Sequence, residues 1–264
     1  MAQEFNVKAL TDYHDLFELV DCVSIAVPTH LHYSIASEFL SAGIDVLVEK
    51  PMAATLADGK KLVDLATETH RILQIGHLER FNPAVRRLES VIQDPRFIEC
   101  HRLAPFVERG TDVDVVFDLM IHDIDVIASL VHAPVEEVHA VGVPILTDKP
   151  DIANARLRFA NGSIANVTSS RVSMKRERKI RFFQPDAYIS LDYDGKRAQI
   201  YRKTGPGKGL ESIQAESVEM QEGDALADEI ESFLNSVRTR EKPLVGGEEG
   251  LTALTIASMI SSQF

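Results

Sequence analysis

The sequence predicts an α/β fold in two parts: a doubly wound parallel sheet, followed by an α+β part with an open antiparallel sheet. Up to about residue 94, short apolar runs alternate with segments of helical periodicity, which is the pattern of right-handed βαβ crossovers. Beyond that point strand-like runs follow one another, joined by Asn161-Gly162 and Asp194-Gly195, pairs that favour tight hairpins. We therefore expect one domain over residues 1–94 and a second over residues 95–264.

Apolar runs and capping residues assign the elements of the first part. Residues 22–27, 44–48 and 72–75 are apolar runs with the length of strands buried on both faces. The helix after the first run should end near Gly43, which favours a left-handed C-terminal turn. Thr55 and Asp58 have capping-box spacing and predict a helix from residue 56. Asn82 followed by Pro83 predicts a further helix over residues 83–93.

The second part contains strands that follow one another without intervening helices. Residues 97–103 form a predicted strand and residues 115–131 a heavily apolar predicted helix. The two hairpins then give an antiparallel sheet with helices to one side. Residues 203–223 are polar and contain glycine, as in a loop or an edge extension. Two helices, near residues 225–239 and 249–260, finish the chain.

Composition limits the class of partner. The 264 residues carry 28 Lys and Arg against 40 Asp and Glu, so the net charge is −12. Phosphate backbones and anionic lipid surfaces repel that charge, which argues against nucleic acid and membrane as partners. Two cysteines exclude a disulfide framework. No apolar run approaches the about 18 residues of a membrane span, and we expect a cytoplasmic protein.

The front of the chain departs from the usual order of a doubly wound layer. Such a layer normally opens with a strand, a glycine-rich turn and a helix. Residues 5–20 instead have the character of a later unit. We therefore expect a truncated layer that lacks its opening βαβ unit of about 30 residues.

Lys50 follows directly on a predicted buried strand, within the sequence Glu49-Lys50-Pro51. Its ammonium group would project from the carboxyl end of a parallel sheet, where open α/β sheets bind ligands. A lysine near a hydrophobic pocket polarises an oxygen or exchanges a proton with it. The alternative is a solvated lysine at the start of a loop.

Asp118 and His122 stand four residues apart in the apolar helix, so both lie on one of its faces. A carboxylate that orients an imidazole is the arrangement a general base needs. Two alternatives are a surface ion pair and, with Asp125, a metal site. The apolar neighbours count against the first. The lack of a nearby cysteine or glutamate-rich cluster counts against the second, and we expect no metal site.

Three further segments are candidates for ligand contacts. Residues 28–32 (PTHLH) follow the first buried strand, where they could bind an anion or simply be capped by Thr29. His77 and Arg80 follow the third strand and point to the same edge, although an arginine such as Arg80 is more often a structural ion-pair partner than a substrate contact. The basic run over residues 171–181 predicts a solvated strand face, with a role near a sugar-nucleotide diphosphate as the alternative.

These pieces together resemble the family of NAD(P)-dependent oxidoreductases that includes glucose-fructose oxidoreductase, inositol dehydrogenase and MocA. The stretch VPTHLHYSIASEFLSAGIDVLVEKPMA is similar to the family's proline-led turn, helix, strand and Glu-Lys-Pro signature. GHLERFNPAV resembles the segment that follows it, and DLMIHDID resembles the family's catalytic helix. The likeness extends from about residue 11 to the end of the chain and implies a Rossmann-like first domain.

The resemblance implies specific roles for these residues. Lys50 would be the catalytic lysine, with a cis bond to the proline that follows it. His122 would be the proton acceptor and Asp118 its neighbour, and these three with Arg80 would contact the substrate. The residues implied to bind the dinucleotide are Pro28, Thr29, His32, Glu49, Lys50 and His77.

The implied activity is hydride transfer between NAD or NADP and a secondary hydroxyl of a sugar or nucleotide sugar. GHLERFNPAV is similar to members that act on UDP-N-acetylglucosamine, which is therefore the favoured substrate class. The family also implies a homo-oligomer, a dimer or a tetramer. The alternative is a catalytically silent, shortened relative that binds a sugar or associates with itself.

Overall fold

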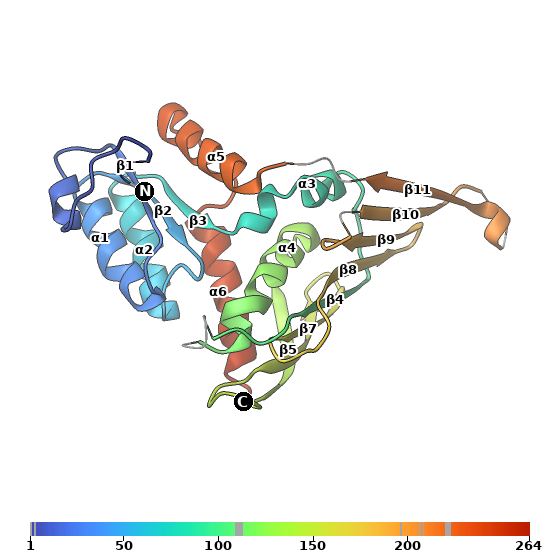
Figure 1. Cartoon of the computed structure of the whole chain (residues 1–264). Helices are drawn as coiled ribbons and strands as arrows, with labels where there is room; N and C mark the ends of the chain where they lie inside the picture. The colour runs from blue at the N-terminus through green and yellow to red at the C-terminus, as the bar shows by residue number, and fades with distance from the viewer. Residues whose placement is uncertain are drawn as a thin grey trace. The chain divides into compact units, whose positions relative to one another are not determined.

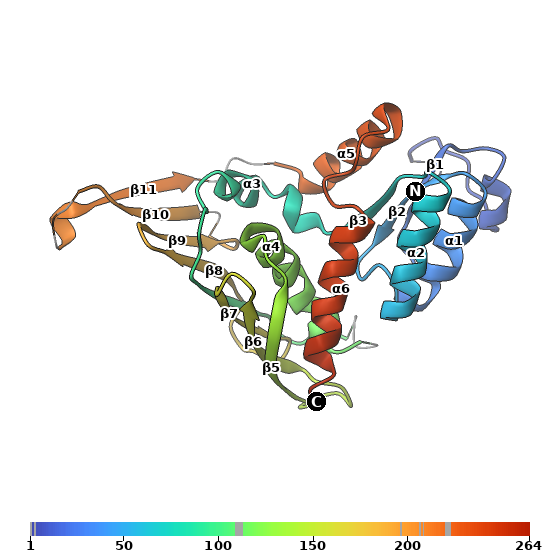
Figure 2. The same ribbon diagram turned by 180° about the vertical axis from the view of Figure 1, so that it is seen from behind.

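The structure, a computed structural model, describes residues 2, 4–108, 113–195, 197–205, 207, 209–219 and 223–264. Figure 1 and Figure 2 show its elements from opposite sides. The chain forms two compact units: Met1–Gly76 with Ser232–Gly247, and His77–Glu231 with Glu248–Phe264. The predicted domain boundary between residues 94 and 95 stays a prediction.

The first unit is built on a parallel sheet in the order β1-β2-β3, with strands β1 (Cys22–Ile25), β2 (Asp45–Glu49) and β3 (Leu73–Gly76). Helices α1 (His32–Ser41) and α2 (Leu56–Glu68) form the crossovers and lie side by side (Figure 1, Figure 2). Two short 3-10 helices, η1 (Tyr13–Leu16) and η2 (Thr29–Leu31), precede β1 and α1. The doubly wound order was thus correctly predicted.

Local capping chemistry places the helix ends of this unit. The Oγ1 atom of Thr55 accepts a hydrogen bond from the backbone N–H of Asp58 at 3.1 Å, which starts α2. Gly43 follows α1 with a φ of +80°, the left-handed conformation that glycine adopts without strain. Both predictions from the sequence are confirmed.

Burial differs between the strands of this sheet. β2 is buried on both faces, and its Leu47 packs with Ile72 and with Phe233 of helix α5 (Ala225–Thr239). On β1, in contrast, Ser24 is exposed. The prediction that this run is buried on both faces is wrong, because within the described residues β1 pairs with β2 alone and forms the edge of the sheet.

The second unit contains a sheet in the order β11-β10-β9-β8-β4-β7-β6-β5. Its strands are β4 (Phe97–Leu103), β5 (Val135–Val143), β6 (Ile152–Phe159), β7 (Ile164–Ser170), β8 (Glu177–Gln184), β9 (Ala187–Asp192), β10 (Arg197–Lys203) and β11 (Ile213–Glu219). β4 and β7 pair in parallel, and the other pairs are antiparallel. The sheet is therefore mixed. The parallel pair is possible because a long connection, with the π-helix η4 (Val116–Met120), the helix α4 (Ile121–Val131), β5 and β6, separates β4 from β7 in the chain.

Helices cover the inner side of this sheet. They are α3 (Pro83–Glu89), α4 and α6 (Gly247–Ser261), with the 3-10 helix η3 (Leu78–Phe81) and the π-helix η4. Helix α3 ends four residues before the predicted position. The backbone N–H groups of Val91 and Ile92 both turn back to the carbonyl of Leu88, so these two side chains are buried beyond the helix end.

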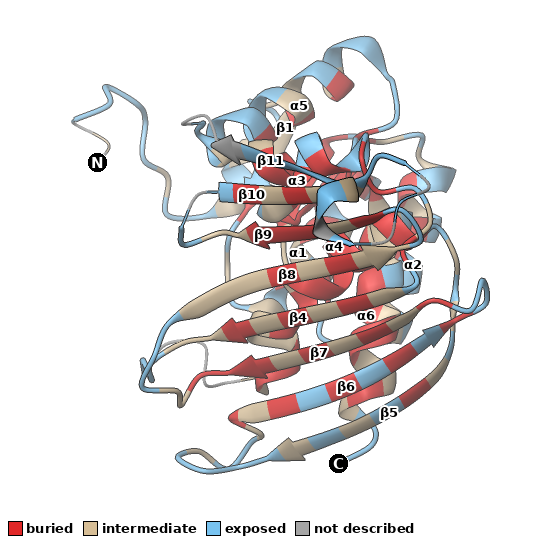
Figure 3. Cartoon of the chain, turned by 90° about the vertical axis from the view of Figure 1, so that its right-hand side faces the viewer, coloured by how far each residue is buried: buried red, intermediate tan, exposed pale blue. Residues whose placement is uncertain are grey.

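The two faces of the large sheet differ in character (Figure 3). Buried residues alternate with less buried ones along β4, β6 and β7, and the buried side chains of the sheet join those of α3, α4 and α6 in one apolar core. The other face carries a row of rings, with centroid separations of 5.5, 5.0 and 5.7 Å along the series Phe97, Phe183, Tyr188 and Tyr201. β11 forms an edge extension in the predicted loop region, of which residues 206, 208 and 220–222 lie outside the described part. No described helix is both long and apolar enough to cross a membrane.

Candidate functional site

The candidate residues of the first unit lie where parallel strands end. Pro28 and Thr29 follow β1, and Glu49 and Lys50 follow β2. Carboxyl ends of neighbouring parallel strands meet at one edge of a sheet, so these residues share that edge. Pro28, and not Thr29, is the N-cap of η2, and it makes no side-chain capping bond. The capping alternative for Thr29 is therefore wrong.

His32 joins the two turns at this edge. Its Nε2 atom lies 2.8 Å from the carbonyl oxygen of Val27, and its Nδ1 atom lies 2.8 Å from that of Pro51. The side chain is buried at the start of α1. His32 therefore fixes the loop after β2 relative to the loop after β1, and the sequence did not predict this bracing role.

Glu49 and Lys50 occupy a constrained turn. Glu49 is paired in register with Gly76 of β3, and a Cβ atom at Gly76 would lie 3.1 Å from Glu49. The backbone N–H of Lys50 is 3.3 Å from Oε2 of Glu49. Lys50 is half-buried, against the solvated alternative, and its bond to Pro51 is cis, as the resemblance implied.

Asp118 and His122 share one helical segment in the second unit. Asp118 lies in the π-helix η4, and His122 lies in the first turn of α4. Both side chains are half-buried, so a plain surface ion pair does not describe them. π-helical turns are uncommon and occur frequently at functional sites. The sequence predicted one continuous α-helix here and missed the wider turn.

Asp123, next to His122, is turned into the protein. Nε and Nη2 of Arg102, on β4, donate hydrogen bonds to the two carboxylate oxygens of Asp123 at 2.8 and 2.9 Å. Nη2 of Arg102 also lies 3.2 Å from Oε1 of Glu79. Burial lowers the pKa of Arg102, but the two carboxylates outweigh burial and raise that pKa further above its ordinary value. This ion pair anchors α4 to β4 at the residue next to His122.

Arg80 and Asp125 form a second buried pair. The Nη1 atom of Arg80 lies 3.6 Å from Oδ1 of Asp125, and the two residues are 7% and 3% exposed. Burial raises the pKa of Asp125, and the positive charges of His77 and Arg80 oppose that rise. His77 is buried as well. This geometry matches the ion-pair alternative for Arg80, and its predicted substrate contact stays a prediction.

The basic run over residues 171–181 is only partly solvated. Lys175 and Arg176 are exposed, as predicted. Arg171 is buried and pairs with Asp151, so the prediction of a solvated face is wrong at this position. The run therefore contains one internal arginine, whose partner lies 20 residues earlier in the chain.

Within the described residues, no group of three or more His, Cys, Asp or Glu side chains is arranged to hold a metal ion. Asp125, the residue considered for such a site, is instead paired with Arg80. The edge of the parallel sheet does fit a dinucleotide. It presents turn residues and a half-buried lysine where three parallel strands end, and His32 braces its turns.

Comparisons with known proteins agree with these features. Residues 1–77 match the oxidoreductase family with an NAD-binding Rossmann fold, and residues 84–190 match the GFO/IDH/MocA C-terminal domain. A UDP-N-acetylglucosamine 3-dehydrogenase from Acidithiobacillus ferrooxidans is 37% identical over 262 residues, covering 98% of this chain and 84% of that protein. The chain belongs to the Gfo/Idh/MocA family. It is an oxidoreductase of the dehydrogenase type with an NAD-binding domain.

Solved structures and a further relative extend the comparison. The crystal form P21 of the Acidithiobacillus enzyme superposes with a TM-score of 0.94, covering 99% of this chain and 84% of that one. A levoglucosan dehydrogenase in complex with NADH and L-sorbose superposes with a TM-score of 0.88 at 18% identity, which shows the shared fold. A myo-inositol 2-dehydrogenase from Thermotoga maritima is 25% identical, covering 94% of this chain and 79% of its own.

These findings decide several predictions. The family, the two-part fold, the oxidoreductase class and the nicotinamide cofactor are confirmed. The expectation that the dinucleotide domain lacks its glycine-rich unit is not borne out, since the NAD-binding family matches from residue 1. The alternative of a catalytically silent domain is not favoured, because the match to a dehydrogenase extends along nearly the whole chain.

Proposed function

We propose that this dehydrogenase oxidises a secondary hydroxyl of a nucleotide sugar of the UDP-N-acetylglucosamine type, using NAD or NADP. The observation that carries the proposal is the 37% identity, over 98% of the chain, to a UDP-N-acetylglucosamine 3-dehydrogenase. The segment over residues 76–85 (GHLERFNPAV), which suggested this substrate class, lies within that match.

His122 takes the proton from the substrate hydroxyl in the proposed reaction. An imidazole accepts a proton well near neutral pH, and a carboxylate on the same helix face orients the ring and stabilises its charged form. We assign that task to Asp118, which lies four residues earlier on the segment that leads into α4. Both side chains contact the substrate in this proposal.

Lys50 stabilises the negative charge that develops on the same oxygen. Its half-buried ammonium stands at the carboxyl end of β2, in a turn fixed by Glu49 and by His32. The bound dinucleotide supplies the hydride acceptor. A fixed positive charge in a partly desolvated site stabilises an alkoxide more strongly than the same charge in water.

The remaining candidate residues have supporting roles. Pro28, Thr29 and Glu49 contact the dinucleotide from the sheet edge, and His32 acts there by bracing the turns. His77 is proposed to flank the nicotinamide. Arg80, predicted to bind substrate, is paired with Asp125 and supports the substrate side through that pair.

The assembly and location are also proposals. The face of the large sheet that carries the row of Phe and Tyr rings supports self-association as a dimer or tetramer. Cys22 and Cys100 are free thiols, which suits a cytoplasmic location. We also retain the division into a dinucleotide domain, residues 1–94, and a substrate and oligomerisation domain, residues 95–264.

A substrate panel tests the proposal. The purified chain is assayed with NAD and NADP against UDP-N-acetylglucosamine, UDP-glucose and myo-inositol, by the absorbance of the reduced nicotinamide. We expect turnover to be highest with UDP-N-acetylglucosamine. His122→Asn should lower kcat by about 10²-fold to 10⁴-fold. His139→Asn changes an exposed histidine of β5 and serves as the control. Preference for myo-inositol would contradict the substrate class.

A further inference from the structure

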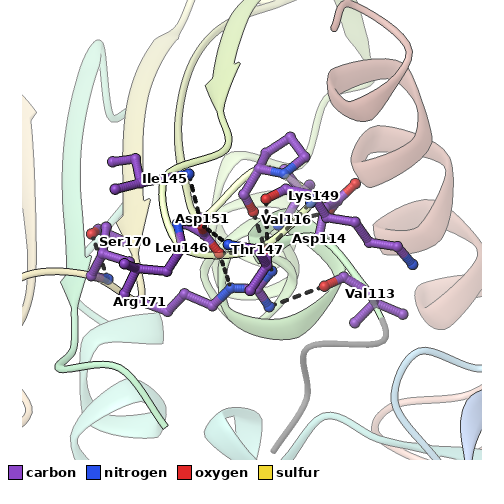
Figure 4. A network of polar contacts seen from close by, with 12 residues as sticks. Val113, Asp114, Val116, Ile145, Leu146, Thr147, Lys149, Asp151, Ser170 and Arg171 are labelled. Atoms are coloured by element: carbon purple, nitrogen blue, oxygen red, sulfur yellow. Dashed lines mark hydrogen bonds and ion pairs between the residues drawn. The ribbon is translucent and has the colours of Figure 1, made fainter. Parts of the chain in front are cut away.

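A buried ion pair ties two strand ends of the large sheet together. Asp151 immediately precedes β6, and Arg171 immediately follows β7. They are 0% and 3% exposed, and Nε of Arg171 lies 2.9 Å from Oδ1 of Asp151 (Figure 4). The backbone N–H of Arg171 also donates to the carbonyl of Asp151 at 2.9 Å. The guanidinium is therefore held at a defined place on the sheet.

The turn before β6 keeps the carboxylate of Asp151 charged. Its Oδ2 atom accepts three backbone N–H groups, at 2.8, 2.6 and 2.9 Å, from Ile145, Leu146 and Thr147 (Figure 4). Its Oδ1 atom accepts the hydroxyl of Thr147 at 2.8 Å. Burial disfavours the ionised form, but these hydrogen bonds outweigh it and hold the pKa of Asp151 well below its ordinary value. Arg171 thus has a permanent counter-charge.

Arg171 reaches from this pair to the chain just before η4. Its Nη1 atom donates to the carbonyl of Val113 at 3.0 Å (Figure 4). The carbonyl of Pro150, next to Asp151, accepts the N–H of Val115 at 3.0 Å. Arg171 therefore fixes the residue before Asp114, and Pro150 fixes the residue after it. Asp114 is the residue that caps the helical segment.

The side chain of Asp114 forms this cap. Its Oδ1 atom accepts the backbone N–H groups of Val116 and Phe117 at 2.9 and 3.2 Å, which starts η4. Its Oδ2 atom accepts the hydroxyl of Ser261 of α6 at 2.5 Å. The cap is thus fixed at its backbone by the tether and at its side chain by α6.

The segment that follows has a conformation that needs such support. In η4 the N–H of Ile121 bonds to the carbonyl of Val116, five residues back, and π-helical turns are rare because they are less favourable than α-helical ones. If the segment returned to α-helical spacing, a shift of one residue would rotate each side chain by about 100°. The direction of Asp118 relative to His122 depends on keeping the wide turn.

We propose that Arg171 is a positioning residue: it holds the π-helical turn and thereby keeps the side chain of Asp118 on the same side of the helical segment as His122. The inference rests on the proposed function, in which these two residues act on the substrate. Arg171 itself is buried and contacts no reacting atom. Its effect passes through the carbonyl of Val113 and the cap at Asp114.

Two substitutions test the tether. Arg171→Lys retains a positive charge for Asp151 but lacks the second arm that reaches Val113. Thr147→Val is milder and removes the hydroxyl that lies between Asp151 and the guanidinium. Leu157→Ala, a buried position of β6 outside the tether, is the control for loss of stability alone.

We expect Arg171→Lys to lower kcat by about 10²-fold while the KM values change by less than about threefold. Deuterium uptake at residues 116–122 should rise in Arg171→Lys, and to a smaller extent in Thr147→Val, but not in Leu157→Ala. If Arg171→Lys does not fold, the decision rests on Thr147→Val by the same two measurements.

Two outcomes overturn the inference: unchanged uptake with unchanged kcat in the Arg171 variant, or an equal loss of kcat in Leu157→Ala. A wild-type chain that turns over none of the sugars with either dinucleotide refutes the proposed function instead. In that case the exchange measurement still decides whether Arg171 holds the turn.

Discussion

The Nδ1 atom of His32 lies 2.8 Å from the carbonyl oxygen of Pro51, so the first residue of α1 holds the turn that carries Lys50. The other ring nitrogen, Nε2, lies 2.8 Å from the carbonyl oxygen of Val27 in the turn after β1. A single buried side chain thus connects two loops that the chain separates by a whole βαβ crossover. The arrangement makes the position of Lys50 depend on a residue that does not need to contact the substrate.

Replacing this histidine should loosen the edge of the parallel sheet. His32→Ala leaves the carbonyls of Val27 and Pro51 without their buried partner, and we expect a loss of about 1–3 kcal/mol in the free energy of unfolding. Dinucleotide affinity should fall with it, because both turns lie at the proposed cofactor site. Denaturant unfolding and a fluorescence titration with NADH measure the two effects. His30→Ala, at an exposed position of the same turn, should change neither, and equal losses in both variants would refute the bracing role.

The close approach of Gly76 to Glu49 predicts a second effect. A Cβ atom there would lie 3.1 Å from both the Cα and the carboxylate of Glu49. Gly76→Ala should therefore shift the Glu49-Lys50 turn and lower the free energy of unfolding by about 1–3 kcal/mol. This loss exceeds the stabilisation that alanine gives by reducing the conformational entropy of the unfolded chain. We expect kcat to fall as well. Gly205→Ala, where a Cβ would meet nothing within 4 Å, controls for the glycine-to-alanine change itself. Wild-type activity in Gly76→Ala would show that the turn tolerates the displacement.

The parts of this fold that the sequence predicted are those with local causes. Thr55 starts α2 and Gly43 ends α1 through interactions within a few residues. Gly162 supports its hairpin with a φ of +83°. The ion pairs at Arg102 and Arg171 could not be predicted, because their partners lie about 20 residues away and are brought close only by helix packing at Arg102 and by strand pairing at Arg171. The π-helical turn was missed for the same reason, since its anchors lie on other strands and on α6.

The buried ion pair between Arg102 and Asp123 should contribute more to the free energy of unfolding than the half-exposed pair between Glu99 and Arg181. Asp123→Asn removes a charge that faces Arg102, whose guanidinium then keeps only Glu79, and we expect a loss of about 3 kcal/mol or more. Glu99→Gln breaks the half-exposed pair with Arg181 and should cost less than about 1 kcal/mol. Chemical denaturation of the two variants side by side measures the difference, and equal losses would contradict the assigned role of burial.

Asp151 should give the stability of the second unit a distinct pH dependence. Its pKa in the folded chain lies well below its ordinary value, despite burial, because the N–H groups of Ile145, Thr147 and Leu146 favour the ionised form. A carboxyl group with a lowered folded pKa contributes stability that is fully present above its unfolded pKa of about 4 and is lost as the pH falls towards the folded value.

The comparison of wild type with Asp151→Asn isolates this contribution. At neutral pH we expect the variant to be less stable by about 3 kcal/mol, because Arg171 is then left buried without its counter-charge. The difference should stay constant down to about pH 5 and shrink progressively below about pH 4, because the carboxyl group of Asp151 becomes protonated in the unfolded wild-type chain while it stays ionised in the folded one. Urea unfolding at a series of pH values measures it, with Asp186→Asn as an exposed control. A difference that keeps its full size in acid would mean that the loss comes from packing, and not from the charge of Asp151.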